Sequence, residues 1–190
     1  MEWTQVDWSK IIFSDETKME IAPRRRQFVR RPPNKRYEAR YITGTKKFSP
    51  SIMLWGAIRA DGRKVLLKCE GSVDQHEYQR LLHNGLPQIY STRYTLMQDG
   101  ATCHTARSTT EYLRQKAVRI LNGWPAQSPD LNIIENLWDD LKLKVKDRNP
   151  VNVDALWQYF QEEFKNISDE YITKLYHSLS RRVKCVVTAK

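Results

Sequence analysis

Three acidic residues, Asp15, Asp99 and Glu135, have the chemistry and the surroundings that a metal site needs. Asp15 and Asp99 each follow the apolar run of a predicted strand, in the stretches IIFSD and TLMQD. Acids at the ends of neighbouring strands meet where the ligand sites of α/β sheets form. Mg²⁺ is commonly held by one or two carboxylates together with substrate phosphate. The pattern therefore predicts a shared cation, although Asp99-Gly100 is also an ordinary turn pair.

Glu135 allows two interpretations from the residues alone. In the stretch NIIE, Asn132 and Glu135 match a capping box, in which both residues satisfy the first turn of a helix. Glu135 also borders an apolar helical stripe, which consists of Ile134, Leu137, Trp138, Leu141 and Val145. A carboxylate at that border can face a cleft between helix and sheet, and Asp139 competes for the role. Asp140 and Lys142 are expected to face water. Spacing alone does not decide between a cap and a metal ligand.

The elements that must position these acids alternate along the chain. Apolar runs predict strands within residues 8–16, 51–62, 63–71, 93–100 and 118–121, the first of them ending at Asp15. Helical spacing predicts helices over residues 74–90, 104–117, 133–148, 152–165 and 168–183. A turn at Asp61-Gly62 makes an antiparallel hairpin of the second and third strands, while helices join the others in parallel. We therefore expect an α/β fold with a mixed sheet flanked by helices.

Composition sets the class of protein. With 40% hydrophobic and 28% charged residues, residues 1–190 are expected to form one folded domain, which ends in C-terminal helices over 151–190. The chain has no apolar run of about 18 residues, so no membrane span is predicted. The first ten residues lack the layout of a signal peptide. Cys69, Cys103 and Cys185 are typical of reduced thiols in an intracellular protein, and their spacing does not predict a zinc site.

The positive charge of the chain is concentrated in residues 22–50. This segment holds ten of the 32 Lys and Arg residues but only one of the 22 acids, Glu38. Aromatic residues lie between the cations, an arrangement that suits phosphate neutralisation together with base stacking. A solvated basic loop is the alternative. Pro32-Pro33 disfavours both a helix and a central strand, so the segment is expected to be an extended arm inserted after the first strand.

Four stretches and the C-terminal end resemble the ordered signature blocks of the catalytic domain of mariner-superfamily DDE transposases. The stretches are WSKIIFSDETKMEI, SIMLWGAI, MQDGATCHTARST and WPAQSPDLNIIENLW, and the end is SLSRRVKCVVTAK. The resemblance implies a ribonuclease H-like fold and two divalent cations, Mg²⁺ or Mn²⁺, held by three acids. Carried over block by block, the catalytic and metal-binding acids fall on Asp15, Asp99 and Glu135.

The sequence departs from the family pattern in three places. Ile133 stands where many members have Pro, which removes a pre-set helix start but no carboxylate. Asp99 and Glu135 are about one residue further apart than is common, and a loop near Asn122-Gly123 can absorb the difference. The N-terminal helix-turn-helix region of the family, which recognises transposon ends, has no counterpart in this chain. We therefore expect a catalytic-domain fragment or a shortened copy.

The resemblance also implies roles and partners. Asp15 would bridge both cations, and Asp99 and Glu135 would each complete one side, for cleavage and transfer of DNA strands. His104 matches a family histidine that either orients a substrate or a carboxylate, or makes an ordinary hydrogen bond at a helix start. Asn132 is interpreted as a cap that supports Glu135. The expected partners are double-stranded DNA, as transposon ends and target, and a second copy in a homodimer. The expected location is the nucleus, with no membrane and no small-molecule cofactor.

The basic segment corresponds to a clamp-like insertion of the family, used in dimer and DNA contacts. Its candidates for phosphate contacts are Arg24, Arg25, Arg26, Arg30, Arg31, Lys35, Arg36 and Arg40. Phosphate contacts hold DNA without reading its sequence. Two alternatives to a transposase follow: a catalytically silent DNA-binding or dimerisation module derived from one, and, by fold analogy, a nuclease of RNA–DNA hybrids.

Overall fold

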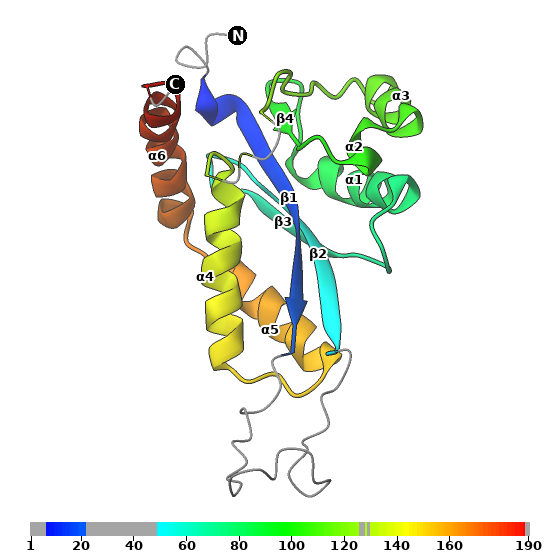
Figure 1. The fold of residues 1–190 in the computed structure, drawn as a ribbon, viewed down its shortest axis with the longest axis vertical. Coiled ribbons are helices and arrows are strands. Elements are labelled where there is room, and N and C mark those ends of the chain that lie inside the picture. Colours follow the sequence, from blue (N-terminus) through cyan, green and yellow to red (C-terminus); the bar gives the residue numbers. More distant parts are fainter. Residues whose placement is uncertain (1–6, 22–48, 126–127, 129, 189–190) are drawn as a thin grey trace, which may run out of the picture.

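A four-stranded mixed sheet forms the centre of the protein. The computed structural model describes residues 7–21, 49–125, 128 and 130–188. The strands are β1 (Ile11–Glu20), β2 (Ser51–Ile58), β3 (Lys64–Lys68) and β4 (Thr95–Met97), in the spatial order β3-β2-β1-β4. β2 runs antiparallel to both β1 and β3, whereas β4 runs parallel to β1 (Figure 1). The mixed sheet that the sequence predicted is confirmed.

β1 is longer than the sequence predicted. Its apolar run ends at Phe13, yet the strand continues past Asp15 to Glu20, because the antiparallel register with β2 extends from the pair Phe13–Ile58 to the pair Glu20–Ser51. Hydrogen bonding to a long neighbouring strand holds these polar residues in extended form. The prediction that the strand ends at Asp15 is wrong, and Asp15 lies in its middle.

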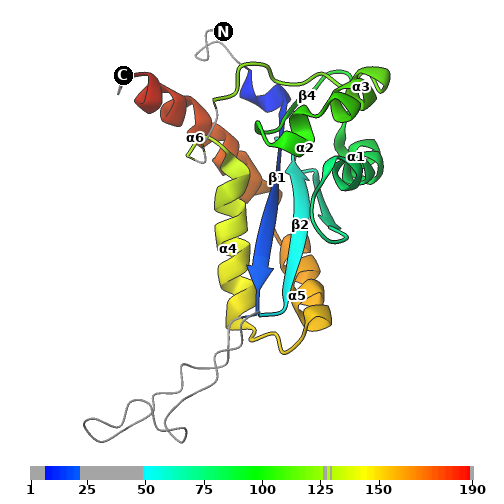
Figure 2. The same cartoon turned by 45° about the vertical axis from the view of Figure 1, so that its right-hand side comes forward.

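Helices cover both faces of the sheet. On one face lie α1 (Gln75–Ile89), α2 (Thr102–Thr105) and α3 (Arg107–Gln115), and on the other lie α4 (Ile133–Asp147), α5 (Val153–Lys165) and α6 (Asp169–Thr188), as Figures 1 and 2 show. A short 3-10 turn, η2 (Trp8–Lys10), precedes β1. Two separate apolar cores fill the spaces between sheet and helices. None of the helices in the described part of the chain is long and apolar enough to span a membrane.

Strand alternation decides which core each residue of β1 meets. Ile11, Phe13 and Met19 belong to the core under α4, α5 and α6, whereas Ile12 belongs to the core under α1. Successive side chains of a strand point to opposite faces. Asp15 therefore faces α4, and its neighbours in the strand face α1 and α2.

Two other predicted elements differ from the structure. The helix predicted over 104–117 is two helices, α2 and α3, which are separated at Ala106. The strand predicted over 118–121 is reduced to one isolated parallel bridge between Ile120 and Leu96. The remaining helices begin and end within a few residues of the predicted bounds, apart from α6, which continues to Thr188.

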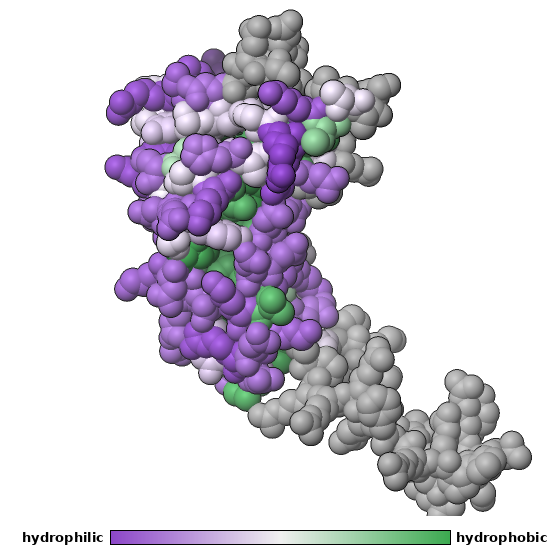
Figure 3. Space-filling model, turned by 90° about the vertical axis from the view of Figure 1, so that its left-hand side faces the viewer, coloured by the Kyte–Doolittle hydropathy of each residue, from purple (hydrophilic) through white to green (hydrophobic). Residues whose placement is uncertain are grey.

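The helices that flank the sheet are amphipathic. In α4 the predicted apolar stripe is buried, and it consists of Ile134, Leu137, Trp138, Leu141 and Val145. The opposite sides of these helices face solvent, and the surface on the side of α4 and α6 is mostly hydrophilic, with small separate apolar patches (Figure 3). Burial of the stripe fixes the rotation of α4 about its axis, and so fixes which of its acids approaches the sheet.

Candidate active site

Asp15 is a half-buried carboxylate in the middle of β1. It pairs across the sheet with Gly56 of β2, on the face that α4 covers. Burial raises the pKa of Asp15 to about 8, and the nearby charges of Glu135, Glu16 and Asp99 act in the same direction. A carboxyl group with this environment gains most from a cation that neutralises the surrounding acids.

α4 lies unusually close to the sheet at Gly56. A Cβ atom on residue 56 would come within 2.7 Å of Cζ2 of Trp138, so only glycine leaves room for the indole ring. Trp138 is fully buried and lies one helical turn beyond Glu135. The contact between Trp138 and Gly56 therefore sets the distance between the first turn of α4 and β1.

Glu135 lies in the first turn of α4 and is half-buried. Burial raises its pKa, Lys142 opposes that change, and Asp139 and Asp99 add to it. Asp139 itself is exposed, as is Asp140. The expectation that Lys142 faces water is wrong, because Lys142 is half-buried. Glu135, and not Asp139, is the acid that α4 turns toward the sheet.

The start of α4 does not need Glu135 as a cap. Asn132 is the N-cap, as predicted, and its side chain accepts a hydrogen bond from the Ile134 N–H at 3.4 Å. The Asn132 N–H donates to the Ser128 carbonyl rather than to Glu135. The reciprocal arm of the predicted capping box is thus replaced by a loop contact, which leaves the Glu135 carboxylate available to a ligand.

A cation from α6 also holds the start of α4. Nη1 of Arg182 donates to the Asp130 carbonyl at 3.0 Å and to Oδ1 of Asn136 at 2.8 Å. Asp130 and Asn136 lie on either side of the first turn that carries Glu135. Arg182 therefore ties the loop and the helix to a third element.

Asp99 lies two residues beyond the end of β4, and its side chain is 52% exposed. β4 pairs with β1 up to the pair Met97–Phe13, and the charge of Asp99 is among those that raise the pKa of Asp15, so each carboxylate lies within electrostatic reach of the other. The Ala101 N–H donates to Asp99 Oδ1 at 2.9 Å, and the His104 ring contacts the same oxygen. These two contacts, the one with His104 first, lower the pKa of Asp99.

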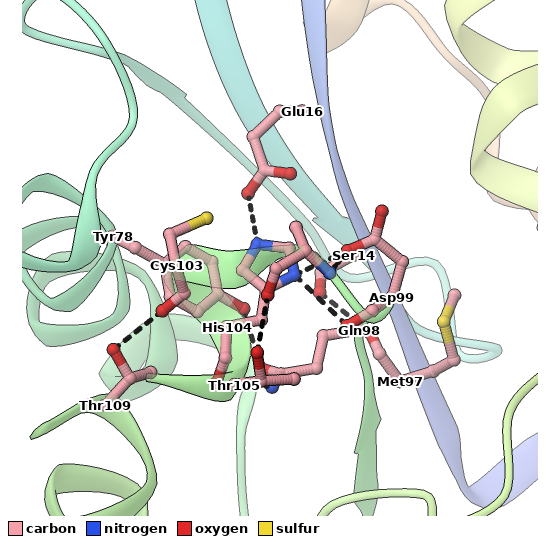
Figure 4. A network of polar contacts seen from close by, with 11 residues as sticks. Ser14, Glu16, Tyr78, Met97, Gln98, Asp99, Cys103, His104, Thr105 and Thr109 are labelled. Carbon is pink, nitrogen blue, oxygen red and sulfur yellow. Dashed lines mark hydrogen bonds and ion pairs between the residues drawn. The ribbon is translucent and has the colours of Figure 1, made fainter. Parts of the chain in front are cut away.

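His104, in α2, is almost completely buried between two acids (Figure 4). Its Nδ1 lies 2.6 Å from Asp99 Oδ1 and its Nε2 lies 3.2 Å from Glu16 Oε1. Burial lowers the pKa of the ring, but the hydrogen bonds to Asp99 and Glu16 outweigh burial and raise it to about 10. Of the two roles that the sequence left open for His104, the structure shows contact with a carboxylate.

The three predicted acids come from both sheet and helix and influence one another's charge. The donor set consists of carboxylate oxygens, which suits Mg²⁺ or Mn²⁺. Within the described ranges, no three His, Cys, Asp or Glu side chains lie close enough together to form a ready metal cage. The three acids still suit a divalent cation, because their oxygen atoms are suitable ligands and a bound cation would relieve the repulsion between the carboxylates.

The predicted DNA contacts fall in a part of the chain that the structure does not describe. All eight basic candidates, Arg24, Arg25, Arg26, Arg30, Arg31, Lys35, Arg36 and Arg40, lie in the segment 22–48, outside the described residues.

The sequence analysis missed two residues, Gly56 and Glu16, which the structure places next to the predicted acids. Alternation along β1 was the available signal for Glu16, because it directs residue 16 to the α2 face where His104 lies.

Known proteins resemble this chain over nearly all its length. A family model described as DDE superfamily endonuclease matches residues 10–157. The Tc1 transposase of Caenorhabditis elegans is 29% identical to the whole of this chain, and the match covers 71% of its own length. The Tcb2 transposase of Caenorhabditis briggsae is 30% identical, and the match again covers the whole chain and 71% of that relative.

Solved structures share the fold. The catalytic domain of Mos1 mariner transposase superposes with a TM-score of 0.69 at 21% identity, over 97% of this chain and 84% of that one. The Mos1 transposase paired-end complex with left transposon end gives a TM-score of 0.73 at 22% identity, and this chain spans 56% of that longer protein. The likeness confirms the ribonuclease H-like mixed sheet that the sequence predicted.

Proposed function

Because the chain belongs to the DDE superfamily endonuclease family, we propose that it acts as the catalytic domain of a DNA transposase. Residues 1–190 would form one such domain, which cleaves DNA strands and transfers them to a target. The observation that carries the proposal is the environment of Asp15, a half-buried acid of β1 whose pKa is raised by burial and by the charges of Glu135, Glu16 and Asp99. Asp15, Asp99 and Glu135, from matching sequence blocks, would share one electrostatic site.

Asp15, Asp99 and Glu135 would hold the two divalent cations, Mg²⁺ or Mn²⁺. When bound, the cations activate an attacking water or DNA 3′-hydroxyl and stabilise the leaving oxygen at phosphorus. The relatives support this choice of metal, since structures of the mariner Mos1 paired end complex exist with Mg and with Mn.

The protein residues contribute position and exclusion of water. Trp138 against Gly56 holds the first turn of α4 at the sheet, and Arg182 holds the loop before it. Asp15 is half-buried, and the lower dielectric around its carboxylate strengthens its attraction for a cation. Cleavage and strand transfer can use the same residues, because both reactions replace one oxygen on phosphorus by another.

DNA is the proposed partner. The concentration of positive charge in residues 22–50 supports binding to phosphates, with Arg24, Arg25 and Arg26 among the contacts. The Mos1 complexes with transposon ends support transposon-end DNA as substrate, and a homodimer would bring two ends together. A chromosomal DNA substrate would require the protein to act in the nucleus.

The experiment is a nicking assay on DNA that carries matching transposon ends, with Mg²⁺ or Mn²⁺. Metal-dependent nicking that is lost in Asp99→Asn supports the proposal, with Glu20→Gln as the control, because Glu20 is an exposed acid on the same strand as Asp15. Nicking that survives Asp15→Asn, Asp99→Asn and Glu135→Gln alike contradicts it. DNA affinity without any cleavage would instead identify a silent binding module, and preference for RNA–DNA hybrids would identify a hybrid nuclease.

A further inference from the structure

Glu16 follows Asp15 in β1, but its side chain lies on the opposite face of the sheet. Ile12 of β1 lies in the core under α1, and strand alternation directs residues 14 and 16 to the same side. Ser14, on that side, donates from its hydroxyl to the Met97 carbonyl at 2.8 Å and so joins β1 to the end of β4. Glu16 Oε1 lies 3.2 Å from Nε2 of His104, and the Glu16 side chain is only 17% exposed. Adjacent acids of one strand thus have different surroundings.

His104 connects Glu16 to Asp99. Nε2 contacts the Glu16 carboxylate, and Nδ1 contacts both the carboxylate and the backbone carbonyl of Asp99, at 2.6 Å and 3.3 Å. The ring therefore bridges an acid of β1 and an acid beyond β4 (Figure 4). Removing the Glu16 carboxylate would take away the contact at Nε2 and let the ring change its orientation.

The surroundings of the ring fix its orientation. The ring of Tyr78, from α1, lies against the imidazole with centroids 4.1 Å apart. The Tyr78 hydroxyl donates to Gln98 Oε1 at 2.8 Å, and Gln98 Nε2 lies 3.4 Å from the His104 carbonyl. Tyr78 is fully buried, so the platform under His104 belongs to the core. The ring can align its two nitrogens with Glu16 and Asp99 without further ordering.

Asp99 has few other constraints. It follows the short strand β4 and its side chain is half-exposed, with the Ala101 N–H as a second anchor beside His104. A side chain at such a position samples several rotamers unless a partner holds it. Outer partners that orient a metal-binding carboxylate or histidine commonly alter metal affinity about 10–100-fold when they are removed.

We propose that Glu16 is a positioning residue, which acts through His104 to hold the Asp99 carboxylate in the orientation that a divalent cation requires. This inference rests on the proposed function, because it takes Asp99 as a metal ligand. Glu16 would not touch the cation or the DNA. It would hold the His104 ring in place, and the ring would hold Asp99.

The test compares the unmodified chain with Glu16→Gln and with the control Glu20→Gln. Glu20 lies on the same strand, but its carboxylate is exposed and pairs with Lys18. Nuclear magnetic resonance would follow the His104 ring nitrogens and the Asp99 carboxyl carbon, and calorimetry would measure the affinity for Mg²⁺ alone. Glu16→Gln should move all three resonances and weaken Mg²⁺ binding about 10–100-fold. Glu20→Gln should leave both readouts unchanged.

A second measurement uses only the unmodified chain, so it does not depend on whether a variant folds. During a Mg²⁺ titration of the unmodified chain, the carboxyl carbon of Glu16 should shift together with that of Asp99 and with the same midpoint. Unchanged Asp99 resonance and Mg²⁺ affinity in Glu16→Gln would overturn the inference, even if the His104 ring responds, because Glu16 would then serve only the packing of His104.

The proposed function can fail separately. If the unmodified chain does not nick DNA while Asp99 still responds to Glu16→Gln, the transposase proposal is contradicted and the positioning role stands. If the unmodified chain binds no Mg²⁺, the proposed function and the inference both fail, because Asp99 then orients no cation.

Discussion

The indole ring of Trp138 occupies the space above Gly56 that any other residue would fill with its side chain. Gly56 pairs directly with Asp15, and Trp138 follows Glu135 by one turn of α4. One packing contact thus governs the approach of a helix acid to a strand acid. Site geometry and core packing are coupled at this point.

Gly56→Ala should therefore reduce nicking more than its loss of stability alone would explain. The new methyl group would displace Trp138, with an overpacking cost of about 1–3 kcal/mol in the free energy of unfolding. The matched control is Gly85→Ala, where a Cβ would come within 2.8 Å of the Trp55 ring on the opposite face of the sheet. Denaturant unfolding and nicking assays would be run on both. Equal nicking in the two variants would show that α4 does not set the site.

Asp15→Asn should stabilise the metal-free chain at alkaline pH. The pKa of Asp15 is raised to about 8 in the folded chain, against 3.8 for an ordinary Asp, so between these values the folded chain keeps a proton that the unfolded chain has lost. Stability therefore falls as the pH rises through this window. The Asn side chain does not titrate, so the variant keeps the free energy of unfolding that the unmodified chain loses. Each kcal/mol kept in this way raises Tm by about 2–4 °C at this chain length. Thermal scans across the window would show a Tm difference that grows with pH; a constant difference would rule out titration of Asp15 as the cause.

Arg182→Met should loosen the first turn of α4. The variant keeps apolar length but loses the donors to the Asp130 carbonyl and to Asn136. Each such bond contributes about 0.5–1.5 kcal/mol, or more because the donor is charged. Hydrogen exchange at the amides of Ile134 and Glu135 should accelerate. Arg181→Met, an exposed neighbour, is the control, and equal exchange in both variants would exclude an anchoring role.

Replacing Arg24, Arg25 and Arg26 by Ala should weaken DNA binding to the same degree on every duplex sequence. Each lost phosphate contact lowers the slope of log affinity against log salt by about 0.9. Filter binding over a range of salt concentrations measures that slope. Lys174→Ala removes one positive charge that already pairs with Glu170 and serves as control. A triple variant with an unchanged slope would place the phosphate contacts elsewhere.

Much of the fold could be predicted from local patterns. The apolar stripe of α4, from Ile134 to Val145, follows directly from helical periodicity, and the hairpin follows from the Asp61-Gly62 turn. The end of β1 could not be predicted, because the residues from Asp15 to Glu20 owe their extended form to hydrogen bonds with β2. Pairing partners distant in sequence decide such boundaries.

The sequence indicated the acids of the candidate site but not the residues that hold them in position. Asp15, Asp99 and Glu135 stand in recognisable blocks, whereas Glu16 gains its meaning only from the histidine that α2 places opposite it. Gly56 likewise carries no signal in a strand until Trp138 packs on it. Contacts between elements, rather than residue types, identify both.

A shared set of divalent cations among Asp15, Asp99 and Glu135 is central to the proposed function. Anomalous diffraction from crystals of this chain soaked in Mn²⁺ tests it most directly, with crystals of Asp15→Asn as the comparison. Density beside Asp15, within coordinating reach of Asp99 or Glu135 and lost in Asp15→Asn, is the predicted result. Ordered Mn²⁺ that binds elsewhere, or that persists unchanged in Asp15→Asn, would contradict a metal site shared by these acids.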